Sequence, residues 1–253
     1  MSRILEVRGV TRRFGGVTAL RAVSFAVGEG EVVAMIGPNG AGKTTCFNVI
    51  DGTLRPDSGE VRFAGERITG LLPEVIARRG IGRTFQVAST FGSLTVRESL
   101  AVALAAREGR DRRFVARPLA TRSAAIDALI TRAGIAQLAD QVCATLAWGD
   151  AKRVELALAH AISPRLMLMD EPTAGLDPDA RRALMREASA LARRDGVAVL
   201  FTEHDMDVVF GFAQRILVLN RGVVVADGPP AEIRASAEVA EAYLGTPATR
   251  HPG

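Results

Sequence analysis

The strongest constraint on the fold is the segment at residues 37–44, whose sequence GPNGAGKT matches the pattern GxxxxGK[ST] in full. It follows the apolar run at residues 32–36, which predicts a buried strand running into a tight turn and then a helix. Glycines let the backbone bend until successive N–H groups point at a polyphosphate, and the helix that opens near Lys43 adds the positive end of its dipole. The segment therefore predicts an α/β fold with a phosphate-binding loop.

The side chains of this loop suggest separate roles in binding ATP. Lys43 supplies a cation for the β- and γ-phosphates, the Thr44 hydroxyl can ligate Mg²⁺, and Thr45 can donate to an inner phosphate. The candidate ATP-binding residues of the loop are Gly37, Pro38, Asn39, Gly40, Ala41, Gly42, Lys43, Thr44 and Thr45.

Composition narrows the class of protein. The 253 residues suffice for one large α/β domain with an inserted or appended subdomain, and no apolar run approaches the roughly 20 residues that cross a bilayer. The N-terminus lacks a secretory h-region, so we expect a cytosolic protein. Cys46 and Cys143 have no His or Cys partner at metal-ligand spacing and predict small core residues. The 32 Lys and Arg are dispersed, which argues against nucleic acid as a partner.

An antiparallel β flap is expected ahead of the phosphate loop. Residues 3–8 alternate apolar and polar side chains, and residues 17–27 resemble a second strand. Phe14 lies at the turn between them, where its ring could stack on an adenine. Packing of the ring against the flap is an equal alternative.

Polar residues follow three of the expected strands and are candidate catalytic residues. Asp170 and Glu171 end an apolar strand, where Asp170 can hold Mg²⁺ through a water and Glu171 can take a proton from the attacking water. His204 follows the strand at residues 197–202 and could orient that water or bind a phosphate oxygen. Gln86 follows a shorter strand and could touch Mg²⁺ or the water. A capping histidine and a solvated glutamine are the structural alternatives.

The helical patterning between these strands suggests an insertion. Residues 91–159 are rich in Ala and Arg at helical spacing and predict a helical subdomain. Residues 1–90 and 160–228 then form the nucleotide-binding core with its β flap. Residues 229–253 form a C-terminal helix, expected near 238–244, and a tail.

With these elements in place, the chain resembles the nucleotide-binding subunits of ABC transporters over nearly its whole length. The resemblance implies a P-loop NTPase core of the RecA type with an antiparallel β flap and an inserted α-helical subdomain, and it implies hydrolysis of ATP with Mg²⁺. Two such subunits pack head to tail, so that the signature segment of one closes over the nucleotide of the other. The motifs behind the resemblance are the phosphate loop, Gln86, a signature segment at Leu146, Ala147, Trp148, Gly149 and Asp150, the strand ending in Asp170 and Glu171, Asp177 in the D-loop, and the switch histidine His204.

Three short motifs point to a subfamily. RTFQ at residues 83–86, RFGG at 13–16 and AYLG at 242–245 look like the ATPases of branched-chain amino acid importers. Related systems for urea or amide uptake and for lipopolysaccharide export share much of this pattern and stay open as alternatives. A soluble, non-transport ABC ATPase is less favoured, because such proteins usually carry tandem ATPase units, which 253 residues cannot hold. A small-molecule kinase is less favoured, because the sequence shows no evident lid.

The resemblance also implies partners and a location. Transmembrane permease subunits and a second ATPase subunit, in a heterodimer or a homodimer, are expected, and a substrate-binding protein acts indirectly. The protein would lie peripherally on the cytoplasmic face of the inner or plasma membrane. Residues 87–94 together with the helical insertion are expected to dock the permease.

The signature departs from the common sequence LSGGQ. Ala147 replaces the serine whose hydroxyl would bond the partner's γ-phosphate, a loss of about 1.5–3 kcal/mol. Gly149 still offers its N–H. Asp150 replaces the glutamine and is expected to cap the helix that follows, with Lys152 and Arg153 offsetting its charge. Tolerated variation is the alternative interpretation.

Overall fold

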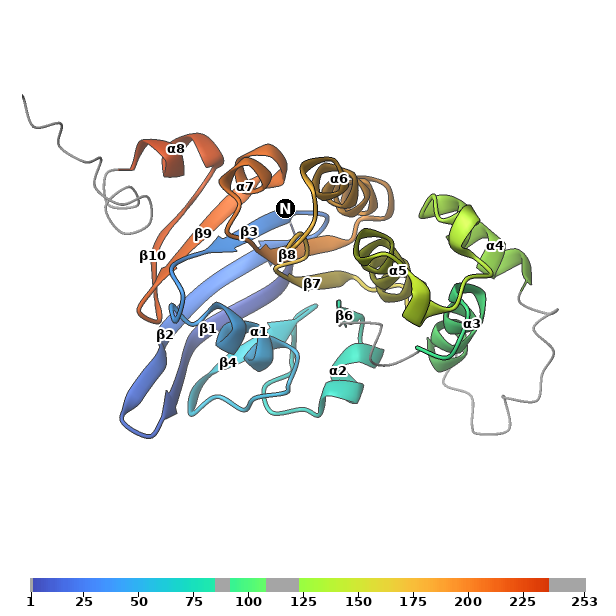
Figure 1. The fold of residues 1–253 in the computed structure, drawn as a ribbon. Coiled ribbons are helices and arrows are strands. Elements are labelled where there is room, and N and C mark those ends of the chain that lie inside the picture. The colour runs from blue at the N-terminus through green and yellow to red at the C-terminus, as the bar shows by residue number, and fades with distance from the viewer. Residues whose placement is uncertain (1, 85–91, 108–122, 237–253) are drawn as a thin grey trace, which may run out of the picture.

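The computed structural model describes residues 2–84, 92–107 and 123–236, and its centre is a six-stranded sheet in the order β10-β9-β3-β8-β7-β6 (Figure 1). Strands β9, β3, β8, β7 and β6 run parallel, and β10 joins antiparallel to β9. Their bounds are β3 (Val32–Ile36), β6 (Ile81–Arg83), β7 (Leu166–Asp170), β8 (Ala198–Thr202), β9 (Arg215–Asn220) and β10 (Val223–Gly228).

The central strands are apolar along their whole length because both faces of the sheet are covered. In β8, Ala198 and Leu200 pack into one hydrophobic cluster, whereas Val199 and Phe201 pack into the other. Alternate residues of a strand point to opposite faces, so a continuous apolar run supplies two cores. Helix α1 (Lys43–Ile50) covers one face, and α6 (Pro178–Asp195) and α7 (Met206–Phe212) cover the other (Figure 1).

A second sheet confirms the expected antiparallel flap. It has the order β2-β1-β4-β5 and comprises β1 (Arg3–Phe14), β2 (Val17–Gly28), β4 (Ser58–Phe63) and β5 (Glu66–Arg67). Strand β1 does not end at residue 8 but continues to Phe14. Gly9 has a φ of +58°, and the register with β2 shifts between Val7 and Val10. Gly9 therefore lies in a β-bulge within the strand and not in a turn that ends it.

The helical region has a hydrophobic core of its own. Helices α3 (Val96–Arg107), α4 (Ser123–Arg132) and α5 (Trp148–Ala161) pack around a cluster that includes Leu100 and Ile126. Figure 1 places α3 and α4 at the end of the molecule that lies away from the antiparallel sheet. Helix α2 (Pro73–Arg78) precedes β6, and α8 (Pro230–Ala235) follows β10. The tail helix expected near 238–244 lies outside the described residues.

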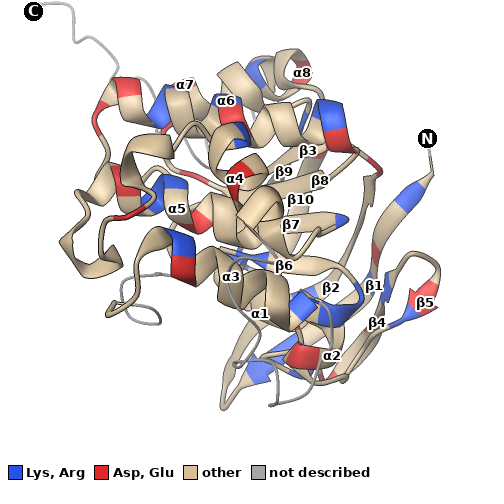
Figure 2. Ribbon diagram, turned by 90° about the vertical axis from the view of Figure 1, so that its right-hand side faces the viewer, with Lys and Arg blue, Asp and Glu red and all other residues tan. Residues whose placement is uncertain are grey.

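Three further observations bear on the sequence expectations. Cys46 and Cys143 are free and buried, and burial raises the pKa of the Cys46 thiol to about 12. No helix among the described residues is long and apolar enough to cross a membrane. Basic and acidic residues are interspersed along the ribbon in Figure 2.

Candidate functional site

The phosphate loop joins β3 to α1, and two of its glycines have no room for a side chain. A Cβ on Gly37 would lie 2.0 Å from the carbonyl oxygen of Leu219. Gly42 has a φ of +107°, and its Cβ would lie 2.5 Å from the carbonyl oxygen of Ala19. The neighbouring strands thus press against the loop backbone, which explains why glycine stands at both positions.

Lys43 begins α1 and is only 7% exposed. Its Nζ donates to the carbonyl oxygen of Gly37 at 2.6 Å and to that of Pro38 at 3.2 Å, so the loop itself satisfies the ammonium group. Burial lowers the pKa of Lys43, and the negative charges of Glu171 and Asp170 partly offset this. The ammonium group of Lys43 therefore interacts electrostatically with the carboxylates of Glu171 and Asp170, as their predicted roles in one site require.

Three of the remaining loop residues lie at the surface. Asn39, Gly40 and Thr44 are exposed, and Thr45 is partly buried in the first turn of α1. Thr44 and the loop backbone lie at the C-terminal end of β3, the side of a parallel sheet where ligands bind.

Thr202, which no local motif of the sequence marks, organises the two acidic residues at the end of β7. Its Oγ1 donates to Oδ1 of Asp170 at 2.7 Å and accepts the N–H of Glu171 at 3.0 Å. Asp170 and Thr202 are register partners across the parallel pair β7–β8. Glu171 has a φ of +46°, so its backbone turns away from the strand direction directly after Asp170. Two adjacent carboxylates are thereby fixed in different directions.

The carboxylate of Glu171 meets the imidazole of His204. Glu171 Oε1 lies 2.9 Å from His204 Nε2, and both side chains are about half exposed. Glu203, which lies between Thr202 and His204 in the chain, is buried. Its carboxylate accepts hydrogen bonds from the N–H and the hydroxyl of Thr173 at 2.8 and 2.6 Å. Glu203 thus ties the end of β8 to the loop after Glu171. Gln86, the third predicted catalytic residue, lies outside the described residues.

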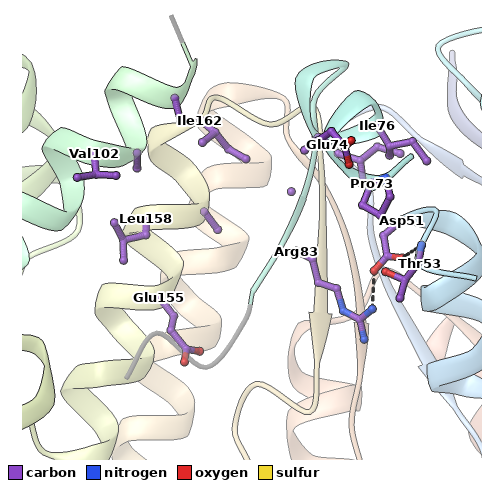
Figure 3. A pocket seen from close by; sticks show the side chains of 16 residues that line it. Asp51, Thr53, Pro73, Glu74, Ile76, Arg83, Val102, Glu155, Leu158 and Ile162 are labelled. Atoms are coloured by element: carbon purple, nitrogen blue, oxygen red, sulfur yellow. Dashed lines mark hydrogen bonds and ion pairs between the residues drawn. The ribbon is translucent and has the colours of Figure 1, made fainter. Parts of the chain in front are cut away.

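Arg83 is a second site residue that sequence reasoning did not assign a role. It ends β6, and its Nη2 lies 3.0 Å from Oδ2 of Asp170. Its Nη1 lies 2.7 Å from Oδ1 of Asn48 in the second half of α1. The same Nη1 lies 2.5 Å from Oδ2 of Asp51, the C-cap residue of α1 (Figure 3). The guanidinium therefore connects the strand before Gln86, the helix after the phosphate loop and the carboxylate of Asp170.

Phe14 lies at the end of β1 and is 47% exposed. The guanidinium carbon of Arg12 lies 4.9 Å from the centroid of the Phe14 ring, a cation–π distance. Arg12 is fixed in turn by Oδ1 of Asp57 at 3.0 Å. The ring is therefore held at the tip of the flap rather than buried in it.

The signature residues form the start of α5. Ala147 is the N-cap residue and provides no side-chain hydrogen bond, and Trp148 is the first helical residue. The expectation that Asp150 caps the helix is wrong, because the helix starts two residues before it. Asp150 lies in the first turn instead, 3.7 Å from Arg153. Arg153 thus offsets its charge, whereas Lys152 lies 3.0 Å from Glu155.

Asp177 caps another helix. Its carboxylate accepts the N–H groups of Asp179 and Ala180, both at 3.0 Å, at the start of α6. These bonds hold the pKa of Asp177 below its usual value. Within the described part of the chain, no hydrogen bond joins residues 147–150 to the phosphate loop. The site of one chain therefore brings together Lys43, Asp170, Glu171 and His204. The signature segment contacts the loop that follows Glu171 instead, through the bond from Trp148 to Ala174.

Comparisons with known proteins agree with this geometry. A family model described as "ABC transporter" matches residues 20–174, and one described as "Branched-chain amino acid ATP-binding cassette transporter" matches residues 223–249. The high-affinity branched-chain amino acid transport ATP-binding protein BraF of Pseudomonas aeruginosa is 40% identical in an alignment that covers 97% of this chain and 99% of BraF.

Two solved structures extend the comparison to nucleotide binding and to dimers. An ATP-binding cassette of an ABC transporter in its ADP conformation has a TM-score of 0.85 and 29% identity, covering 97% of this chain and all of that one. A dimeric cassette in a post-hydrolysis state, bound to ADP and Pi, has a TM-score of 0.75 and 27% identity, covering 89% and 98% of the two chains. The chain belongs to the ABC transporter family, as one of its ATP-binding and ATP-hydrolysing subunits.

Proposed function

We propose that this chain energises an importer of branched-chain amino acids. The observation that carries the proposal is the match to BraF from end to end, at 40% identity. The second family model supports it independently, since it covers residues 223–249 and so includes the AYLG motif. The transported compound itself does not touch an ATPase subunit, so relatives rather than site geometry support the choice of substrate.

Uptake by cells tests this proposal. Disruption of the chain in its host should abolish uptake of radiolabelled leucine and leave urea uptake unchanged. Wild-type protein should restore leucine uptake, and Glu171→Gln protein expressed to the same level should not. Loss of urea uptake with normal leucine uptake would reject the proposal in favour of a related system.

The proposed chemistry assigns one task to each residue of the site. Lys43 leaves the carbonyl oxygens of its own loop and binds the β- and γ-phosphates, while Phe14 stacks on the adenine. Glu171 accepts a proton from the water that attacks the γ-phosphate, and His204 orients that water and the carboxylate of Glu171. Gln86 would contact the same water or the metal ion.

Mg²⁺ is the proposed cofactor, and the donor chemistry fits it. No cluster of three or more His, Cys, Asp or Glu side chains able to hold a metal occurs in the described ranges. Mg²⁺ bound with a polyphosphate needs few protein ligands and prefers oxygen. The hydroxyl of the exposed residue Thr44 and the carboxylate of Asp170 are such donors, and Thr202 and Arg83 hold that carboxylate in place. The ion would neutralise phosphate charge during hydrolysis.

A second ATPase subunit would complete each nucleotide site. We propose a head-to-tail dimer in which residues 147–150 contact the nucleotide of the partner, in line with the lack of a hydrogen bond between these residues and the phosphate loop of their own chain in the described ranges. The altered signature favours a heterodimer, with a homodimer as the alternative.

A groove between the core and the helical region is the proposed docking site for a permease subunit. It has a volume of about 420 Å³ and lies between α2, β6, α3 and α5, with Val102, Leu158 and Ile162 on one wall and Ile76 on the other (Figure 3). Residues 87–91 of the expected docking segment lie outside the described residues. Val102→Asp should abolish transport and spare basal ATPase activity; normal transport in this variant would reject the site.

The proposal includes an organisation and a location. The chain would act as a single ATPase domain with residues 91–159 as its helical subdomain and 229–253 as a C-terminal helix and tail. It would bind peripherally to the cytoplasmic face of the inner or plasma membrane through the permease. Membrane fractionation with and without the permease tests this location.

A further inference from the structure

The indole of Trp148 joins the signature segment to the loop that follows β7. Its Nε1–H donates to the carbonyl oxygen of Ala174 at 3.0 Å, across 26 residues of sequence. Trp148 is the first residue of α5, and Ala174 lies in the loop of residues 171–177 that leads into α6. The common signature has glycine at the position of Trp148 and so has no side chain to make this bond.

Two neighbours fix the position of the indole. Gly175 has a φ of +76°, and a Cβ added there would lie 3.2 Å from Nε1 of Trp148, so the loop backbone packs directly on the ring. On the helix, Nζ of Lys152 lies 5.1 Å from the ring centroid. The indole nevertheless keeps 48% of its surface exposed. Contacts within its own chain therefore fix the indole, and its exposed surface remains accessible to a partner subunit.

The loop that Trp148 binds is a short structural link to Glu171. The N–H of Ala174 donates to the carbonyl oxygen of Glu171 at 3.1 Å, which closes a turn. The residue whose carbonyl accepts the indole is therefore bonded through its own N–H to Glu171. A change in the Trp148 contact acts on that turn directly.

The C-terminal end of the loop is anchored near the pair formed by Glu171 and His204. Nε of Arg181 donates to the carbonyl oxygen of Leu176 at 2.7 Å, and Nη1 of Arg181 lies 2.5 Å from Oδ2 of Asp205. Asp205 directly follows His204, which binds Glu171 at 2.9 Å. Besides the bonds of Thr173 to Glu203, the loop is thus held by Arg181 and by Trp148. Of these contacts, the one from Trp148 belongs to the signature segment.

We propose that Trp148 is a positioning residue that makes the orientation of Glu171 in one nucleotide site depend on the position of the signature segment, which acts at the partner's site. This inference rests on the proposed function for the roles of Glu171 and of residues 147–150. Trp148 acts through the Ala174 turn rather than by contact with the reacting atoms. Movement of the start of α5 against the partner's nucleotide therefore alters the restraint on the catalytic turn of its own chain.

Steady-state kinetics of the reconstituted transporter test the proposal. Trp148→Phe keeps an aromatic ring but lacks the N–H donor, and it should lower kcat about three- to tenfold, the range that one neutral hydrogen bond supports. The KM for ATP should change less than about twofold. Trp148→Ala should lower kcat at least as much. If the indole only fills space, the kcat of Trp148→Phe should equal that of the wild type, whereas the kcat of Trp148→Ala should be lower. This result would overturn the proposal.

Hydrogen exchange provides a readout that does not depend on activity. In the full-length, nucleotide-free chain, the peptide spanning residues 171–177 should exchange faster in Trp148→Phe than in the wild type, because the loop loses its hydrogen bond to α5. Peptides from β9 should exchange at equal rates in both. Unchanged exchange of the loop, or a raised KM for ATP with normal kcat, would show that Trp148 contacts nucleotide or packs only, and would reject the inference.

Glu171→Gln measured in parallel separates the two proposals. If Glu171→Gln retains turnover, the assigned role of Glu171 fails, and the proposed function must be revised. If Glu171→Gln is inactive and Trp148→Phe equals the wild type, only the positioning role of Trp148 fails.

Discussion

The guanidinium of Arg83 lies 3.0 Å from the carboxylate of Asp170 while it also holds Asp51 at 2.5 Å. The side chain of Arg83 is 12% exposed and that of Asp51 is 9% exposed, so water screens this pair poorly. Removing one partner of a buried ion pair leaves the other charge uncompensated. Arg83→Met should therefore lower the free energy of unfolding by about 3–5 kcal/mol, measured by urea denaturation.

Arg182→Met is the matched control for this substitution. Arg182 also pairs with an aspartate, Asp179, at 2.6 Å, but the two side chains are 55% and 93% exposed. An exposed pair contributes about 0–1 kcal/mol, so this variant should unfold close to the wild type. Equal losses of the free energy of unfolding in the two variants would contradict a stabilising role for the buried ion pair of Arg83.

Lys43 and Glu171 should separate binding from turnover. Lys43→Ala removes the buried cation next to the phosphate loop and should weaken ATP affinity, measured by equilibrium binding. Glu171→Gln keeps the shape of the side chain but cannot accept a proton, so affinity should persist and turnover should stop. Equal losses of affinity in both variants, or wild-type turnover in Glu171→Gln, would reverse these assignments.

Thr202 should affect turnover more than binding, because its hydroxyl bonds both Asp170 and the N–H of Glu171. Thr202→Val has nearly the same shape without the hydroxyl, and it should lower kcat about tenfold or more, the effect of losing a hydrogen bond to a charged group. Thr202→Ser keeps the hydroxyl and should retain most of the activity. A Val variant as active as the Ser variant would contradict the orienting role.

These residues show where sequence reasoning succeeds and where it stops. The phosphate loop, the buried strands and the flap are local patterns of glycines and alternating side chains, and the sequence predicts each of them, although β1 continues beyond the expected residue 8 to Phe14. Thr202 and Arg83 depend on the register of β8 against β7 and of β6 against β7, which no local pattern contains. The bulge at Gly9 and the start of α5 before Asp150 both differ from what the local sequence signals predict.

Glu187 on α6 should make stability depend on pH. Burial raises the pKa of its carboxyl, and the charge of Arg153 offsets this only in part. Its Oε2 is buried without a hydrogen-bond partner in the described part of the chain. A raised pKa means that the folded protein binds the proton more tightly than the unfolded chain. The stabilisation is therefore complete below the ordinary glutamate pKa of about 4.3 and is lost as pH rises through the folded pKa.

Glu187→Gln removes this titration, so its stability relative to the wild type should increase as pH rises from about 4 toward 7. Urea denaturation of both proteins across this range measures the difference. Glu232→Gln makes the same chemical change at an exposed position on α8 and serves as the control. A difference between wild type and Glu187→Gln that stays constant with pH would contradict the raised pKa.

The altered signature predicts two unequal nucleotide sites if the partner is a different ATPase. The site on this chain's phosphate loop would borrow the partner's signature, whereas the site on the partner's loop would be closed by Ala147, Trp148 and Gly149. Ala147 ends in a methyl group at the N-cap of α5, so it offers no hydroxyl to a phosphate. Ala147→Ser should raise turnover at the partner's site by about tenfold, the effect of one hydrogen bond to a charged group.

A serine at this position also caps α5, which alone stabilises a helix by about 1 kcal/mol, so capping must be separated from phosphate binding. Ala147→Gly is the matched control, because glycine is a good N-cap residue without a hydroxyl. In the reconstituted complex, the glutamate-to-glutamine change blocks each site in turn, and ATPase rates are measured with Ala, Ser or Gly at 147. Only Ser should accelerate the partner's site, since only Ser donates to the γ-phosphate. Equal gains with Ser and Gly would assign the effect to the helix cap. A fully active homodimer, or no gain with Ser at either site, would leave Ala147 as tolerated variation and reject the asymmetry.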